Sequence, residues 1–189
     1  WARPDTASGF QSVVTSRYDE FPDVRGFILY NTSGGNWSFW TGGGPGAGSW
    51  NTLDGPAVTV ATWTHLAISY DAATQTKTLW VNGEVAATTT SQGYAPNPSR
   101  DLHIGGGGDF GDQYPFEGRI DDVGLYDTAL DQAAIQTIMT SGVPDSGGTF
   151  YGDLINTDVV AAMEGVNASA YIRTSFDVAD PTVIDSLLL

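Results

Sequence analysis

The amino-acid sequence predicts an all-β fold in which two antiparallel sheets pack face to face, with one short helix near the C-terminal end. Two observations predict this class. Turn-forming residues recur at short intervals, with 24 glycines and 9 prolines in 189 residues. Between the turns, short stretches alternate apolar and polar residues, as strands with one buried face do, whereas helical spacing is scarce. Many short strands separated by turns are typical of a β-sandwich.

Several stretches carry the strand pattern. The expected strands cover residues 10–17, 24–31, 37–41, 57–60, 65–71, 76–81, 85–90, 102–104 and 116–126. In residues 24–31, Phe27 and Leu29 would share one face, and Ile28 and Tyr30 would share the other. Asn82-Gly83 predicts a tight turn between two strands, because both residue types tolerate a positive φ angle. Residues 116–126 give the longest strand signal.

One helix is expected over residues 130–139. Helical spacing would place on one face the apolar residues Leu130, Ala133, Ala134, Ile135 and Ile138. Asp127 or Thr128 can cap the start of this helix, and Gly142 can end it.

The composition divides the chain into three parts. We expect a β-domain over residues 1–142, then a linker over residues 143–149, where Pro, Asp, Ser and Gly prevail. Residues 150–189 carry strand-like stretches but are too few to bury a core of their own. They predict the beginning of a second β-rich module or a strand-donating tail. Because the pattern begins and stops in mid-strand, we expect an internal piece of a longer protein.

The charge and the cysteine content exclude several classes of function. Seven basic against 22 acidic residues give a formal net charge of −15, which disfavours nucleic acid, anionic membranes and acidic polysaccharides and favours bound cations. The absence of cysteine excludes disulfides, zinc–thiolate sites and thiol catalysis. No run of about 18 apolar residues is present, so no membrane insertion is expected. Many glycines and few lysines suit an extracellular or cell-surface protein, secreted by a bacterium.

An ordered set of short motifs carries a family resemblance. The motifs are WTHLA at residues 63–67, YD at 70–71, LWVNG at 79–83, LHIG at 102–105, FEGRIDDV at 116–123, LY at 125–126 and AL at 129–130. Together they resemble the laminin-G-like, concanavalin A-like jelly roll over residues 1–141. The resemblance implies two antiparallel sheets, one of them concave, in a module of a bacterial secreted protein. It also implies that one or two N-terminal strands are missing, which would leave a sheet edge open.

Adjacent carboxylates are the sharpest candidates for a metal site. Asp121 and Asp122 would point to opposite faces of the strand expected over residues 116–126. The resemblance implies that Asp121 helps to hold a structural Ca²⁺, an ion that needs six to eight oxygen ligands. The alternative is that Asp121 accepts hydrogen bonds from backbone amides at a bulge. Asp109 and Asp112, in a glycine-rich loop, could form another oxygen-rich site or be solvated.

Aromatic residues in loops, or in strands that flank a loop, are the candidates for ligand contact. Sugars present flat C–H faces that stack on aromatic rings, and loops at the end of a sandwich commonly carry ligand sites. The candidates are Trp50, Trp37, Trp40, Tyr94, Tyr114 and Asn51. For Trp37 and Trp40, core packing is an equal alternative, whereas Trp50 lies among Gly, Ser and Asn and is expected to be exposed. Trp63 and Trp80 belong to the strand motifs and are expected to be structural.

The residue pattern argues against catalysis. Glycoside hydrolases use two carboxylates that flank the scissile bond, but no two glutamates lie at strand spacing and the E-x-D-x-x-E pattern is absent. His65 has no evident nucleophile or carboxylate partner and is expected to be structural.

We therefore predict a non-catalytic, Ca²⁺-stabilised carbohydrate-binding module of a larger secreted or surface protein, with a polysaccharide or glycan as its partner. The alternative is a protein-interaction or self-assembly module, in which an open sheet edge accepts a strand from another copy or another chain.

Overall fold

The computed structural model describes residues 1–107 and 113–143. The chain divides into two units, Trp1–Val143 and Pro144–Leu189, and the first unit is the one described below. The predicted linker after Val143 and the predicted β-rich segment 150–189 lie outside the described residues and remain predictions.

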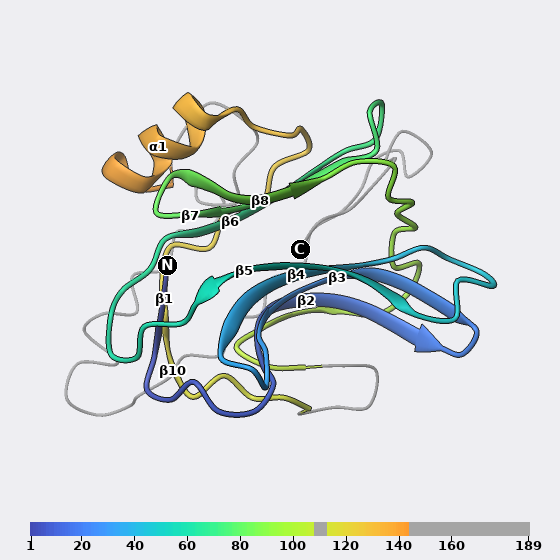
Figure 1. The fold of residues 1–189 in the computed structure, drawn as a ribbon, viewed down its shortest axis with the longest axis horizontal. Coiled ribbons are helices and arrows are strands. Elements are labelled where there is room, and N and C mark those ends of the chain that lie inside the picture. The colour runs from blue at the N-terminus through green and yellow to red at the C-terminus, as the bar shows by residue number, and fades with distance from the viewer. Residues whose placement is uncertain (108–112, 144–189) are drawn as a thin grey trace, which may run out of the picture. The chain divides into compact units, whose positions relative to one another are not determined.

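Two antiparallel sheets face each other in this unit (Figure 1). One sheet has the strand order β5-β4-β3-β2-β9 and the other has the order β6-β7-β8, while β1 pairs with β10 in a short ladder. The elements are β1 (Ala2–Pro4), β2 (Gln11–Glu20), β3 (Asp23–Asn31), β4 (Asn36–Gly42), β5 (Trp50–Ala57), β6 (Leu66–Asp71), β7 (Thr76–Val81), β8 (Glu84–Thr89), β9 (Leu102–Ile104), β10 (Gly118–Ile120) and α1 (Gln132–Ser141). The predicted all-β sandwich with one short helix is confirmed.

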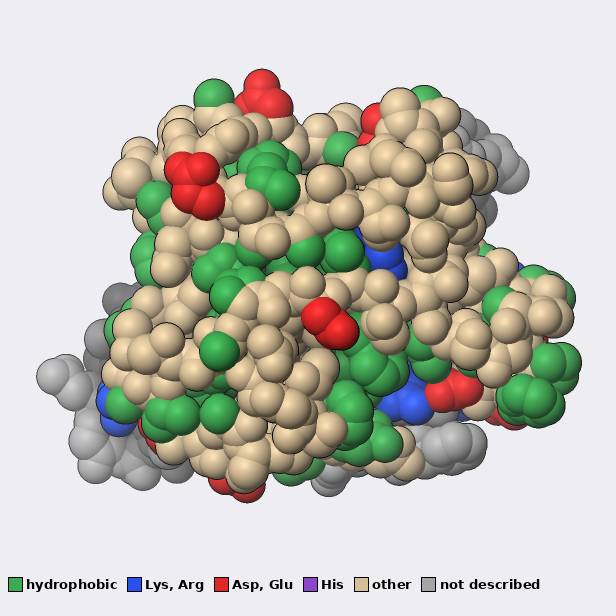
Figure 2. Space-filling model, in the orientation of Figure 1, with side chains coloured by type: hydrophobic (Ala, Val, Ile, Leu, Met, Phe, Trp, Pro, Cys, Tyr) green, Lys and Arg blue, Asp and Glu red, His purple; other side chains and the backbone are tan. Residues whose placement is uncertain are grey.

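The hydrophobic core lies between the two sheets. Phe39 of β4 stands opposite Leu29 of β3 and Leu53 of β5, so that the three side chains share the face that meets the other sheet. The buried core residues are Ala2, Val13, Leu29, Trp37, Phe39 and Leu79. Figure 2 shows hydrophobic side chains in the band between the two layers. Burying each large apolar side chain contributes about 1.5–3 kcal/mol to stability.

A lysine is buried inside this core. Lys77 of β7 extends to the opposite sheet, where its Nζ donates hydrogen bonds to the carbonyl oxygen of Asn51 (2.6 Å) and to Thr41 Oγ1 (3.3 Å). Burial lowers the pKa of Lys77 to about 8, against a smaller opposing effect of the charge on Asp54. The amine therefore ties β7 to β4 and β5, through neutral oxygen acceptors.

The strand that carries Trp50 lies elsewhere than the sequence predicts. Residues 57–60 were expected to form a strand, but the strand is β5, which ends at Ala57. Gly55 and Pro56 conceal this strand in the sequence, because both residue types are unfavourable inside a sheet. β5 tolerates the proline because it is the edge strand, and it needs the glycine because an added Cβ would lie 2.6 Å from Leu79 Cδ2.

The long strand expected over residues 116–126 is also wrong in extent, because the observed strand β10 covers only Gly118–Ile120. Within the predicted strand 116–126, only β10 pairs, with the three residues of β1. The chain then leaves the ladder, and Asp122 has a φ angle of +50°. Phe116 and Ile120 pack against the core, which explains the apolar pattern, whereas Val123 is exposed.

Helix α1 is confirmed, with a later start than predicted. The N-cap is Asp131 rather than the predicted Asp127 or Thr128, since Asp131 Oδ1 accepts a hydrogen bond from the Ala134 amide (2.8 Å). Gly142 follows the last residue, as predicted. Gln132 and Gln136 both donate to the carbonyl oxygen of Gly83. These contacts fasten the helix to the turn between β7 and β8.

Candidate functional site

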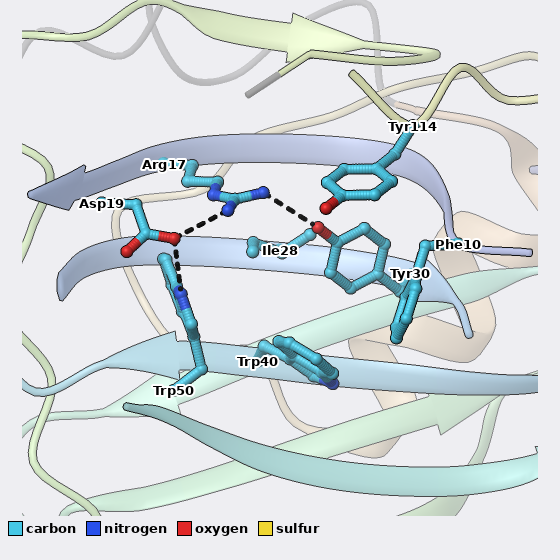
Figure 3. A pocket seen from close by; sticks show the side chains of 8 residues that line it. All are labelled: Phe10, Arg17, Asp19, Ile28, Tyr30, Trp40, Trp50 and Tyr114. Carbon is cyan, nitrogen blue, oxygen red and sulfur yellow. Dashed lines mark hydrogen bonds and ion pairs between the residues drawn. The ribbon is translucent and has the colours of Figure 1, made fainter. Parts of the chain in front are cut away.

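A pocket of about 110 Å³ lies on the outer face of the five-stranded sheet, opposite the core. Strand register puts it there: Trp40 pairs with Ile28 of β3, one residue out of phase with the core pair of Phe39 and Leu29. Its lining residues are Phe10, Arg17, Asp19, Ile28, Tyr30, Trp40, Trp50 and Tyr114 (Figure 3). They come from strands β2 to β5 and from the segments that precede β2 and β10.

Four of the rings pack against one another at one side of the pocket. We call Phe10, Tyr30, Trp40 and Tyr114 the aromatic cluster. Its ring centroids lie 5.1–5.9 Å apart in edge-to-face arrangements. Such contacts fix ring orientations and contribute about 0.5–1.5 kcal/mol per pair beyond the area buried. The cluster therefore forms a rigid wall.

Arg17 lies between this cluster and Trp50. The centre of its guanidinium is 5.7 Å from the ring centroid of Tyr114 and 5.8 Å from that of Trp50. One guanidinium nitrogen donates to Asp19 Oδ2 (2.7 Å) and another donates to the hydroxyl of Tyr30 (3.2 Å). Burial is the largest single effect and lowers the pKa of Arg17, but the hydrogen bond and charge of Asp19, together with Tyr30 and Tyr114, outweigh it, so the pKa is raised. The pocket thus holds an ion pair among aromatic rings.

Hydrogen bonds orient the two tryptophans. Trp50 Nε1 donates to Asp19 Oδ2 (3.3 Å), the same oxygen that accepts the hydrogen bond from Arg17. Trp40 Nε1 donates to Ser38 Oγ (2.8 Å), and that hydroxyl donates to Asp54 Oδ1 (2.6 Å). Both indole rings remain half-buried. Their exposed parts are therefore available to a ligand while their orientations are held.

Three of the six predicted contact residues meet in this pocket: Trp40, Trp50 and Tyr114, the last with 37% of its surface exposed. Trp37 does not, because it is 1% exposed and belongs to the core. Of its two predicted roles, the ligand contact is wrong and core packing is right. Trp63, expected to be structural, is instead 40% exposed.

Asn51 and Tyr94 do not line the pocket. The Asn51 side chain donates to the carbonyl oxygen of Gly93 (3.4 Å), while its own carbonyl oxygen receives Lys77. Tyr94 packs against Tyr70 with ring centroids 5.0 Å apart, and burial raises the pKa of Tyr94 to about 12. Both residues contribute to structure rather than to this site.

The polar part of the site was not predicted from the sequence. Arg17 and Asp19 are two residues apart on β2, which puts both on the outer face. Ile28 and Tyr30 were assigned to the face opposite Phe27 and Leu29, but that face was not connected with Trp40. The alternation of side chains along each strand could have identified these outer-face residues. Grouping them into one site also required knowing that β2, β3 and β4 are neighbours.

The carboxylates proposed for calcium do not form an evident metal site. Asp121 and Asp122 are exposed, and Asp121 Oδ1 accepts a hydrogen bond from the Asp122 amide (3.0 Å). Within residues 1–107 and 113–143, no three acidic or histidine side chains converge on one point. Two carboxylates do not supply six to eight oxygens, so these residues do not fit a Ca²⁺ site by themselves. Asp109 and Asp112 lie outside the described residues.

His65 is buried, with 6% of its surface exposed. Its ring meets Trp1 edge to face at a centroid distance of 5.2 Å, and burial lowers the pKa of His65. It does not line the pocket described above. This environment suits packing.

A family model described as the concanavalin A-like lectin/glucanases superfamily, Laminin_G_3, matches residues 1–136. The chain belongs to this superfamily, as the ordered motifs indicated. The search of curated proteins gave no match.

Solved structures share the fold. The CBM40 module of a Ruminococcus gnavus IT-sialidase, bound to α2,3 sialyllactose, is 22% identical, with a TM-score of 0.61 over 73% of this chain and 78% of that one. A leech intramolecular trans-sialidase is 25% identical, with a TM-score of 0.59 over 81% of this chain and 24% of that one. A putative carbohydrate binding protein from Bacteroides ovatus is 20% identical, with a TM-score of 0.58 over 78% and 41%.

Proposed function

We propose that residues 1–143 form a non-catalytic carbohydrate-binding module, whose binding site is the pocket on the outer face of the five-stranded sheet. One observation carries this proposal. Two half-buried tryptophans and an exposed tyrosine, all held in orientation, surround a hollow that also contains the ion pair of Arg17 and Asp19. Rings of this kind stack on the C–H faces of a sugar, and the charged groups bind its hydroxyls.

The size of the pocket supports a small ligand unit. Pockets for drug-sized molecules measure about 300–1,000 Å³, and this one is about 110 Å³. A hollow of this size suits a single sugar ring whose edges remain in solvent. It would therefore bind one residue of a longer glycan.

The comparisons support the same class of ligand. The fold is shared with a module bound to sialyllactose and with a putative carbohydrate binding protein. The superfamily description covers both lectins and glucanases. Because a fold can host unrelated functions, the proposal depends on the residues of the pocket.

The pocket chemistry supports binding rather than hydrolysis. Of the residues that line it in the described structure, Asp19 is the sole carboxylate, and it is occupied by Arg17 and Trp50. Glycoside hydrolysis needs a pair of carboxylates on opposite sides of the scissile bond. A non-catalytic role therefore fits this lining.

We further propose that the module works within a larger secreted or surface protein. Among the described residues, no helix is long and apolar enough to cross a membrane. The alternative of self-assembly through an open edge stays a prediction. Ala2 of β1 bridges Thr64 while β1 pairs with β10, so the start of the chain lies between two backbone partners.

The test compares two tryptophans. Trp50→Ala should weaken binding to immobilised polysaccharides by at least about tenfold, because a buried aromatic contact at the centre of a site contributes more than about 1.4 kcal/mol. Trp63→Ala is the matched control, because Trp63 is exposed but lies outside the pocket. Equal losses in both variants would contradict the proposal, as would the absence of binding by the wild type across a broad glycan panel.

A further inference from the structure

We infer that the pocket selects an uncharged sugar residue and discriminates against a carboxylated one, because Asp19 cancels the charge that Arg17 would offer to an anion. This inference rests on the proposed function, and it names the class of sugar that the site accepts.

The charge balance of the pocket is the first step. Arg17 is the sole basic residue among the described lining residues, and Asp19 is the sole acidic one. Their side chains are 14% and 26% exposed and meet at 2.7 Å. At this distance, with rings on both sides, the two charges compensate each other, and the site offers a ligand no net positive charge.

A carboxylate in the pocket would approach both charges at once. Attraction to Arg17 would be opposed by repulsion from Asp19, because both groups lie within one small hollow. Like charges brought together in a partly desolvated site are unfavourable. A sugar carboxylate would also lose its hydrating water on entering the pocket. No unpaired positive charge among the described lining residues would offset that loss.

The rest of the molecule does not supply the missing positive charge. The formal net charge of the chain is −15. Three of the four other arginines of the described part are paired with carboxylates, in the ion pairs Arg3–Asp5, Arg25–Asp23 and Arg100–Glu20. The fourth, Arg119 of β10, does not line the pocket. The long-range field therefore repels an anionic glycan before it reaches the pocket.

An uncharged sugar finds suitable partners in the same place. The guanidinium of Arg17 carries five N–H donors, and its two side-chain hydrogen bonds go to Asp19 and Tyr30. Because Nε is buried, the remaining N–H groups of Nη1 and Nη2 are the ones that can meet the oxygens of sugar hydroxyls. Rings of the aromatic cluster and of Trp50 lie on either side of Arg17, where the C–H faces of the sugar can pack.

The experiment uses pairs of probes that differ by one carboxylated unit or group. Lactose is compared with sialyllactose, and a methyl glucoside is compared with the matching glucuronide, by calorimetry at two salt concentrations. In each pair the neutral probe should bind at least about fivefold more tightly. Its affinity should change little with salt, whereas the affinity of the acidic probe should rise with salt as repulsion is screened.

Asp19→Asn sharpens the test. The amide keeps the shape and an oxygen acceptor for Arg17 and Trp50 but removes the negative charge, so the preference for the neutral probe should shrink by about fivefold or reverse. Asp5→Asn is the control, because it removes the same charge from an exposed ion pair outside the pocket. Unchanged melting temperatures would show that both variants fold.

The outcomes are separable. Tighter binding of the acidic probe by the wild type would overturn the inference while leaving carbohydrate binding intact. A preference that survives Asp19→Asn unchanged would also overturn it. If no probe in either pair and no polysaccharide binds, the proposed function fails and the inference fails with it.

Discussion

The two faces of the five-stranded sheet are both rich in aromatic rings, but they use them differently. On the inner face, Trp37 and Phe39 are almost completely buried against the other sheet. On the outer face, Trp40 and Trp50 are half-buried, and each indole N–H is held by an oxygen of the pocket network. The same type of residue therefore packs in the core on one face and lines the pocket of the proposed site on the other.

Trp37 and Trp40 show that strand register decides which face a tryptophan occupies. They are three residues apart on β4, and because side chains alternate along a strand they point to opposite faces. Trp37 pairs with Asn31 and Trp40 with Ile28. A shift of one residue in this register would exchange the core ring and the site ring.

The largest expected effect separates these two tryptophans by stability. Trp37→Ala should lower the free energy of unfolding by about 3–5 kcal/mol, because it leaves a cavity in the core. Trp40→Ala, at a half-buried position on the outer face, should lower it by less than half as much. Urea unfolding, followed by far-UV circular dichroism, measures both values.

The binding data should show the reverse order. At a temperature where both variants fold, Trp40→Ala should lose affinity for the glycan and Trp37→Ala should retain it. Equal destabilisation by the two substitutions would mean that the outer ring also belongs to a closed core, and the contrast between the faces would not hold.

The sequence was sufficient for the fold class and most strands but not for the site, and the reason is physical. Alternation in residues 24–31 and 65–71 reflects the local period of a strand, which does not depend on neighbouring strands. The pocket depends on register, which brings Arg17 of β2, Ile28 of β3 and Trp40 of β4 onto one face. Register is set by long-range pairing, so these residues could not be grouped from spacing alone.

The misplaced strand has a similar cause. The propensity of Gly55 and Pro56 argues against a strand, but both lie at an irregularity in the β4–β5 register, between the pairs Ser38–Asp54 and Asn36–Ala57, where the edge strand continues without pairing them. Trp50 and Asn51 were consequently assigned to a loop. Trp50 was expected to be exposed, but it begins an edge strand and is half-buried there.

The second prediction concerns Lys77, the lysine that β7 buries between the two sheets. The pKa of Lys77 is lowered to about 8 in the folded state from an ordinary 10.5. Between these two pH values the unfolded chain holds a proton that the folded chain has released, so stability rises with pH. Relative to a Lys77→Met variant, which does not titrate here, the wild type should gain up to about 3 kcal/mol between pH 7 and pH 10.5.

The comparison with Lys77→Met removes the titration of other groups. Tyr94, for example, has a pKa raised to about 12 and loses stability with rising pH above its ordinary value of 10, but it does so in both proteins. Unfolding by urea at several pH values gives the difference curve. A flat curve would mean that burial does not penalise the charge of Lys77.

The smallest expected effect concerns the rim rather than either face. Asp121 and Asp122 follow β10 at the edge of the sandwich, and calcium binding there remains a prediction. Because the described residues place two carboxylates together and not three, any ion held there should bind weakly. Weak binding stabilises the fold by about 1 kcal/mol at millimolar calcium, so removal of calcium with EDTA should lower the melting temperature by no more than about 3 °C.

The control is Asp121→Asn, which should remove whatever response to EDTA these two carboxylates produce. A fall in melting temperature well above 3 °C that disappears in Asp121→Asn would show a strong ion site at the rim, completed by oxygens beyond the two aspartates. A large fall that persists in the variant would place the ion elsewhere in the chain. In neither case should the neutral-sugar affinity follow the melting temperature, because the pocket is built from the outer face of β2 to β5 and its lining contains neither aspartate.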